Sequence, residues 1–219
     1  MSTNCYSPPR DNGLDLVYDD ESIIVVNKPA GLLSVPGRGA DKTDSMTSRV
    51  QKEFPDARNV HRLDMSTSGL IVLARGEEMH RHISRMFRER HVEKRYIAMV
   101  AGQMRAVAGE VDLPLGPDWP NRPRQKVDFS FGKHSVTRYR QLARAASAYA
   151  CRVELEPLTG RTHQLRLHMA AIGHPILGDA LYGGEASGGA ARLLLHASAL
   201  SFAHPQSGKR LSFECAPPF

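Results

Sequence analysis

The sequence predicts a mixed α+β fold with a mainly antiparallel sheet, formed by a single catalytic domain over residues 1–219. Candidate strands outnumber candidate helices and do not alternate regularly with them, which argues against a parallel βαβ arrangement. No internal repeat or low-complexity linker divides the chain. A chain of 219 residues is also long enough to bury a full core.

The first third of the chain contains the elements nearest to its polar motifs. SIIVVN at 22–27 predicts a buried strand that ends in a lysine and a proline. A short helix is expected over 43–54, where Asp and Ser occur early. Two strands are then expected at 60–63 and 70–74, joined by a polar loop.

The clearest helix is expected over 77–90, where apolar residues recur at the helical period. The face expected to enter the core carries Met79, Ile83, Met86 and Phe87. The opposite face carries Arg81, Arg85 and Arg88. This arginine stripe is interpreted either as a solvated face or as an RNA contact.

The remaining elements are mostly short strands, which supports the α+β prediction. We expect strands at 96–100, 126–131, 135–142 and 151–157, a turn at 157–160, an amphipathic helix over 162–172 ended by Gly173, a flexible loop at 183–191, and a closing hairpin of 192–202 with 209–215.

The charge and composition restrict the classes of partner. A net charge of +6 and a pI near 9.4 favour a polyanion such as RNA. No apolar run approaches the ~20 residues that span a bilayer, and the first residues do not resemble a signal peptide. We therefore expect a cytoplasmic protein without a membrane partner. The three cysteines have no zinc-site spacing and HExxH is absent, so no metal site is expected.

The stretch VHRLDMSTSGLIVLA at 60–74 contains more polar chemistry than a turn needs. A second basic cluster, GRTHQLRLH, occupies 160–168. Phosphate-loop, kinase-loop and GxSxG patterns all fail to fit the chain. Taken alone, each cluster is better explained by a structural role, such as a salt bridge flanking an Asx turn.

Together, the clusters resemble one family. HRLDMSTSG at 61–69 is similar to the HRLDxxTSG signature of the RluA family of pseudouridine synthases. NKPAGLLSVPGR at 27–38, EKRYIA at 93–98 and GRTHQLRLHMAAIGHPILGD at 160–179 agree in the same order. The resemblance covers essentially the whole chain.

The resemblance implies an isomerase that detaches uracil from its ribose and rejoins it through carbon, with neither cofactor nor metal. By motif, Asp64 is the essential catalytic aspartate. Tyr96 matches the tyrosine that stacks on the target base, and Arg166 the arginine that pairs with the aspartate. Arg62 resembles the arginine that helps to displace the flipped nucleotide.

Neighbouring residues are expected to have supporting roles. His61 and Thr67 are expected to contact substrate, while the hydroxyls at 66–68 and Gly69 hold the loop. Arg166 is expected to project towards Asp64 and keep it charged. The rest of its helix would be anchored in the core by Leu165, Met169 and Ile172.

The resemblance also bears on substrate and organisation. We expect no N-terminal S4 domain of the kind that many relatives carry. LLSVPGR with DWPNRPRQKV (118–127) is most similar to a member that acts on both 23S rRNA and tRNA anticodon stem-loops. We expect a monomer with these RNAs as partners. The alternatives are a non-catalytic RNA-binding protein of the same fold and a hydrolase whose basic charge is incidental.

Overall fold

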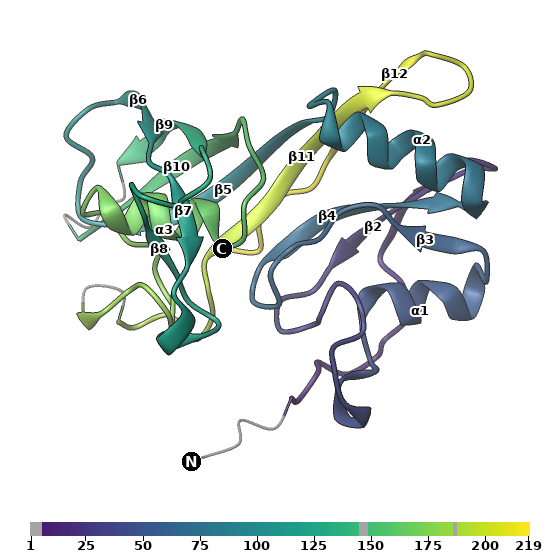
Figure 1. Ribbon diagram of the computed structural model, residues 1–219, viewed down its shortest axis with the longest axis horizontal. Coiled ribbons are helices and arrows are strands. Elements are labelled where there is room, and N and C mark those ends of the chain that lie inside the picture. Colours follow the sequence, from purple (N-terminus) through teal and green to yellow (C-terminus); the bar gives the residue numbers. More distant parts are fainter. Residues whose placement is uncertain (1–5, 145–148, 186–187) are drawn as a thin grey trace. The chain divides into compact units, whose positions relative to one another are not determined.

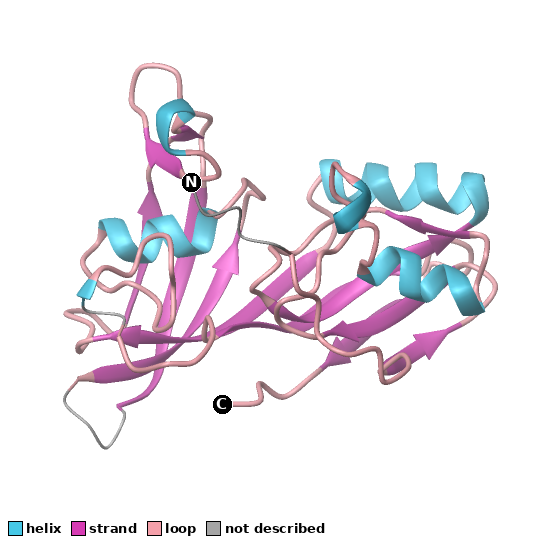
Figure 2. Cartoon of the chain, turned by 90° about the horizontal axis from the view of Figure 1, so that it is seen from below, coloured by secondary structure: helices cyan, strands magenta, loops and turns pink. Residues whose placement is uncertain are grey.

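The computed structural model describes residues 6–144, 149–185 and 188–219. The chain forms two compact units, which Figure 1 shows with their elements labelled. The first unit comprises Met1–Glu93 and Ala197–Pro217, and the second comprises Lys94–His196 with the last two residues. Strands make up most of the regular structure (Figure 2), and every strand pairing with a described register is antiparallel. The α+β prediction is confirmed.

The first unit is a sheet with the strand order β1-β2-β4-β11, in which β3 pairs with β4 and β12 with β11. Its elements are β1 (Leu16–Asp19), β2 (Ile23–Lys28), the 3₁₀ turn η1 (Ala40–Lys42), α1 (Met46–Glu53), β3 (Ala57–Asn59), β4 (Ser68–Arg75), α2 (Gly76–Arg88), β11 (Leu195–Ala203) and β12 (Arg210–Glu214). The predicted strand at 22–27, both predicted helices and the closing hairpin are confirmed.

The apolar face of α2 packs into the core of the first unit, as its periodicity predicts. Met79, Ile83 and Met86 are buried in one cluster with alternate residues of β2 and β4. The arginines of the opposite face, Arg81, Arg85 and Arg88, are all exposed. Exposure is compatible with both interpretations of the stripe.

The predicted strand at 60–63 is wrong, because β3 ends at Asn59. Hydrogen bonds to side chains hold this part of the chain, in place of the backbone hydrogen bonds between paired strands. The imidazole Nε2 of His61 accepts the N–H of Val72 on β4 at 3.1 Å, and the N–H of Leu63 donates to the Ser34 hydroxyl at 3.0 Å. The stretch before Asp64 is therefore an ordered loop.

The second unit is built on strands in the order β5-β10-β9-β6, with β7 and β8 forming a separate pair. Its elements are β5 (Glu93–Ala101), β6 (Ala108–Asp112), β7 (Leu115–Pro117), the 3₁₀ turn η2 (Trp119–Asn121), β8 (Gln125–Val127), β9 (Val136–Arg144), β10 (Ala150–Pro157) and α3 (Gln164–Ala171). The strands expected at 96–100, 135–142 and 151–157 are confirmed.

Two predictions for the second unit need correction. The strand expected at 126–131 is only β8, since the Asp128 carboxylate accepts the N–H groups of Ser130 and Phe131 and forms a turn. The helix α3 is not amphipathic, because every residue of 164–169 is buried. The predicted loop at 183–191 includes residues 186–187, which lie outside the described residues.

A buried polar network explains how α3 can be enclosed on all sides. The Gln164 amide donates to the Val136 carbonyl and the Thr137 hydroxyl and accepts from Thr159 at 2.7 Å. One turn later, His168 lies between the Thr137 hydroxyl and the Leu113 carbonyl. Burial lowers the pKa of His168, so its imidazole is neutral at pH 7. Buried polar groups satisfied in this way hold α3 in one orientation.

The structure predicts that Gly69 of the signature cannot be replaced. Its φ is +113°, and an added Cβ would lie 2.3 Å from the Ala197 carbonyl oxygen of β11. We expect Gly69→Ala to lower the free energy of unfolding by roughly 3 kcal/mol or more, from strain and overpacking. Urea denaturation measures this loss.

The matched control is Gly76→Ala, because Gly76 also has a positive φ but has no atom within 4 Å of an added Cβ. Its loss should be limited to about 1 kcal/mol of backbone strain. Equal losses in the two variants would contradict the importance of the close approach to β11.

Candidate active site

Asp64 lies on a short loop between β3 and β4 in the first unit. The loop is closed by a hydrogen bond from the Thr67 N–H to the Asp64 carbonyl at 3.1 Å. Asp64 is half-buried, whereas Thr67 and Ser68 are buried. The two buried hydroxyl residues belong to the interior of the loop, which agrees with their expected role in holding it.

Lys28 binds the backbone on the C-terminal side of Asp64. This lysine is the last residue of β2 and is fully buried. Its ammonium donates to the carbonyl oxygens of Pro29, Leu32 and Met65, at 2.9, 2.7 and 3.2 Å. A buried charge is tolerated only where such partners surround it. Lys28 therefore ties the NKPAGL turn to the residue that follows Asp64.

Ser34 binds the backbone on the other side. Its hydroxyl donates to the Leu63 carbonyl at 2.7 Å and accepts the Leu63 N–H at 3.0 Å. The Gly31 N–H adds a bond to the Met65 carbonyl at 2.8 Å. Both neighbours of Asp64 are thus held by the 28–34 segment, which fixes the backbone from which the carboxylate projects.

The start of α1 in turn holds Ser34. The first N–H groups of a helix have no partner within it. In α1 the N–H groups of Met46 and Thr47 bind the carbonyls of Leu33 and Ser34, at 2.7 and 3.1 Å. The N-cap of α1 is Ser45, whose side chain forms a capping box with Ser48. A chain of bonds thereby runs from α1 through Ser34 to the Asp64 loop.

His61 and Arg62 differ in their surroundings although they are adjacent. The His61 ring stacks on Phe87 of α2, with centroids 4.4 Å apart. Its Nε2 accepts a backbone N–H, so a neutral ring carries its proton on Nδ1. Arg62 is exposed, and within the described ranges no carboxylate forms an ion pair with it. Arg62 can therefore meet a nucleic-acid phosphate directly.

Arg166 is bound by a carboxylate that the sequence did not reveal. In the second unit, Asp179 accepts from the Arg166 Nε at 2.8 Å and from Nη2 at 2.7 Å, and both residues are buried. Burial alone would raise the pKa of Asp179. The hydrogen bonds and charge of Arg166 outweigh burial, and the pKa lies below its ordinary value.

Tyr182 contacts both this ion pair and His163 at the start of α3. The Arg166 guanidinium lies 5.3 Å from the ring centroid of Tyr182. The Tyr182 hydroxyl contacts the Nδ1 of His163 at 2.7 Å and accepts the Gln125 N–H at 2.7 Å. His163 has a left-handed backbone, with φ +55°, which is uncommon outside glycine. The segment before α3 is thus fixed by side-chain contacts on both sides.

Tyr96 lies on β5, opposite Leu155 of β10, and packs against the core of the second unit while remaining partly exposed. Leu165 and Met169 are members of that core, and Ile172 packs against it, so the predicted anchoring of α3 is confirmed.

The predicted site residues belong to both units. One loop of the first unit carries His61, Arg62, Asp64 and Thr67, and the second unit carries Tyr96 and Arg166.

The sequence reasoning missed three residues that position this site, namely Lys28, Ser34 and Asp179. All three occur inside the segments that resemble the family. A lysine at the end of a strand as apolar as IIVV is the signal for Lys28, because a buried ammonium needs several acceptors. Among the described residues, no group of His, Cys, Asp or Glu is arranged to hold a metal ion.

Comparison with known proteins identifies the family. The model of the RNA pseudouridylate synthase family matches residues 22–171. The chain is 50% identical, over 220 residues and the full length of both proteins, to the dual-specificity RNA pseudouridine synthase RluA of Escherichia coli K12. It is 51% identical to the protein of that name from Vibrio cholerae, covering 94% of this chain and 84% of the relative.

The chain belongs to the RluA family of pseudouridine synthases. It is therefore an RNA pseudouridine synthase, an isomerase. Among solved structures, human RNA pseudouridylate synthase domain containing 1 has a TM-score of 0.80 and 30% identity, covering 97% of this chain and 87% of the other. No helix in the described part of the chain is long and apolar enough to cross a membrane.

We predict that Arg166→Met destabilises the fold in a pH-dependent way. Near pH 7 the substitution leaves the buried Asp179 charge without its arginine, which costs about 3–5 kcal/mol. In the wild type the low pKa of Asp179 contributes stability that is lost only as the pH falls through that pKa. In the variant burial raises the pKa, so protonation relieves the cost as the pH falls.

Urea denaturation of both proteins at several pH values between about 7 and 4 measures this difference. The gap in free energy of unfolding should narrow towards acid pH. The double variant Arg166→Met/Asp179→Asn should recover much of the loss near pH 7. A gap that is independent of pH would contradict the account.

Proposed function

We propose that this pseudouridine synthase isomerises specific uridines in large-subunit (23S) rRNA and in tRNA anticodon stem-loops, with Asp64 as the essential carboxylate. The observation that carries the proposal is the position of Asp64. It is the carboxylate of the family signature, it is half-buried, and the backbone on both of its sides is bound by the 28–34 segment. The dual specificity in the names of the full-length relatives supports the choice of two RNAs.

The reaction requires that a uridine leave its stack before its glycosidic bond can be reached. The N1–C1′ bond breaks, uracil turns, and a C5–C1′ bond forms; C5 loses its hydrogen as a proton, and N1 gains a proton. An ionised Asp64 can serve this sequence by attacking a carbon or by taking a proton, and carboxylates are established nucleophiles. The overall change consumes no oxidant, reductant or group donor, because product and substrate are isomers.

Tyr96 and Arg62 are proposed to stabilise the extruded nucleotide. Flipping costs a few kcal/mol, and stacking on an aromatic ring contributes about 1–3 kcal/mol per base. Tyr96 is partly exposed on β5 and can offer one ring face. Arg62 is exposed on the Asp64 loop and can occupy the vacated space or bind phosphate. His61 and Thr67, on the same loop, are proposed to contact the substrate as well.

Arg166 is proposed to keep Asp64 charged and oriented. A pocket that stacks a base is partly apolar, and desolvation there favours the neutral acid. Asp179 binds Nε and Nη2 of the guanidinium, and a guanidinium has five N–H donors. Asp179 thus fixes the plane of the Arg166 guanidinium. The N–H groups that Asp179 does not use can donate to a second carboxylate. We assign Asp64 to that position.

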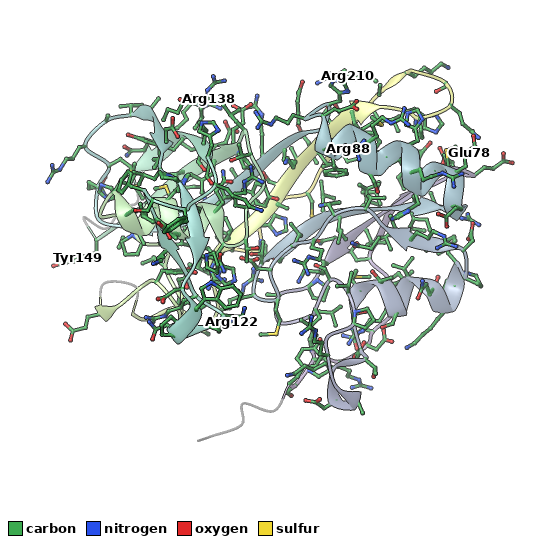
Figure 3. All side chains as sticks on the ribbon, viewed as in Figure 1. Glu78, Arg88, Arg122, Arg138, Tyr149 and Arg210 are labelled. Carbon is green, nitrogen blue, oxygen red and sulfur yellow. The ribbon has the colours of Figure 1, made fainter. Side chains whose placement is uncertain are left out.

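The setting proposed for this chemistry is a cytoplasmic monomer that binds RNA. The net charge of +6 favours a polyanion. The exposed stripe of Arg81, Arg85 and Arg88 on α2 is a candidate for phosphate contact, and Arg88 is labelled in Figure 3.

Asp64→Asn is expected to abolish pseudouridine formation while leaving fold and RNA affinity nearly unchanged, because the amide keeps the shape of the side chain and loses its charge. Release of tritium from RNA carrying C5-labelled uridine, measured under single-turnover conditions, reports the reaction. Asp41→Asn, at an exposed acid in η1, is the matched control and should retain full activity. Substantial turnover by the pure Asp64→Asn protein would refute the assignment.

A further inference from the structure

The second unit contains a pocket of about 350 Å³ that includes none of Asp64, Tyr96 and Arg166. One wall comes from β7, β8 and the turn after β8, and the other from the segment that leads into α3. Phe131, Lys133 and Arg161 contribute its aromatic and cationic groups, and no lining residue is acidic. Its volume falls in the range of small-ligand sites, about 300–1,000 Å³.

Phe131 is an aromatic ring displayed on a rigid turn. It is 90% exposed, which is unusual for so large an apolar side chain. The Asp128 carboxylate accepts the N–H groups of Ser130 and Phe131, at 3.1 and 3.0 Å, and the Asp128 carbonyl accepts that of Gly132 at 2.8 Å. Because the backbone is already ordered, stacking a planar group on this ring costs little further backbone entropy.

Lys133 is fixed next to this turn. Its N–H and carbonyl both bond to Leu115 of β7, at 2.8 and 3.0 Å. Gly132 permits the close packing, because an added Cβ would lie 2.2 Å from the Asp128 carbonyl oxygen and 2.9 Å from the carbonyl carbon of Pro114. The backbone that carries Phe131 and Lys133 is therefore fixed on one wall.

Arg161 occupies the opposite wall and is equally well anchored. Its N–H donates to the buried Gln164 side chain at 3.0 Å, and its Nε donates to the His134 carbonyl at 3.3 Å. Across the described ranges, neither Arg161 nor Lys133 forms an ion pair with a carboxylate. The nearby Asp128 is engaged by Lys126 at 3.6 Å. Two cations thus remain available to an anionic ligand.

An exposed ring beside unpaired cations is the combination that binds single-stranded nucleic acid. The ring can stack on any base, and the cations can bind the adjoining phosphate. The absence of acidic groups from the lining also means that no carboxylate there would repel a bound phosphate. The known reaction of the family supplies the polyanion, since its substrate is RNA.

We propose that this pocket binds a nucleotide of the RNA other than the target uridine, with its base on Phe131 and its phosphate on Lys133 and Arg161. The proposal rests on the action of the enzyme on RNA and assigns a second nucleotide subsite outside the catalytic residues. The subsite holds the strand by shape and charge and does not select one base.

Fluorescence anisotropy with a fluorescein-labelled oligouridylate tests the stacking contact. Phe131→Ala should weaken binding about 5- to 150-fold, the equivalent of one stacked base, whereas Phe131→Tyr should retain wild-type affinity. Phe129→Ala is the matched control, because Phe129 is 79% exposed two residues away but does not line the pocket. It should bind as the wild type does.

The salt dependence of the same binding tests the phosphate contact. Lys133→Gln should reduce the slope of log affinity against log salt by about 0.7, the value for one phosphate of a single strand. Arg138→Gln is the control, because Arg138, which is labelled in Figure 3, is paired with Glu110 at 3.1 Å in the same unit. Its slope should equal that of the wild type.

Equal affinities of Phe131→Ala and Phe129→Ala, an unchanged slope for Lys133→Gln, or no binding of oligouridylate by the wild type would each overturn the proposal. Tritium release separates this result from the proposed function. A wild type that binds through Phe131 but modifies neither proposed RNA would refute the proposed substrates and leave the subsite intact. Melting curves by circular dichroism should be the same for all these variants.

Discussion

The backbone around Asp64 is fixed by side chains from a segment about 30 residues earlier in the chain, and the proposed chemistry depends on that constraint. The Lys28 ammonium binds the Met65 carbonyl, and the Ser34 hydroxyl binds both backbone groups of Leu63. An exposed loop held only by its own turn would let the carboxylate sample many positions. In this protein the bound backbone restricts the positions that the Asp64 carboxylate can take, as a positioned catalytic group requires.

The same principle recurs in the second unit, where one buried carboxylate orients a cation. Asp179 accepts two hydrogen bonds from the Arg166 guanidinium. Arg166 lies on the buried helix α3, which a network of satisfied hydrogen bonds holds in place. Each unit thus presents one charged group on a rigid support. The free-energy cost of burying Lys28 and Arg166 is offset in part by partners that are not adjacent in sequence. These partners are the Met65 carbonyl for Lys28 and the Asp179 carboxylate for Arg166.

Periodicity predicted the elements whose hydrophobic pattern decides their structure, such as β2, α2 and the β11–β12 hairpin. It failed where side chains compete with backbone pairing: His61 takes the β4 N–H that a strand at 60–63 would use, and Asp128 turns the chain after β8. The motif resemblance supplied the site residues and their proposed roles. It did not indicate Lys28 or Ser34, because their importance comes from contacts with a segment distant in sequence, nor Asp179, whose role comes from a buried ion pair with Arg166.

The most direct test of the central claim is the single-turnover rate of Ser34→Ala at saturating RNA, measured by tritium release. Removing one hydroxyl frees both backbone groups of Leu63 while leaving every proposed RNA-contacting group in place. The account predicts a rate reduced by about 10- to 100-fold with unchanged RNA affinity, and faster hydrogen exchange at the Leu63 amide. A wild-type rate despite the faster exchange would contradict it, because the loop would then not need to be held for Asp64 to act.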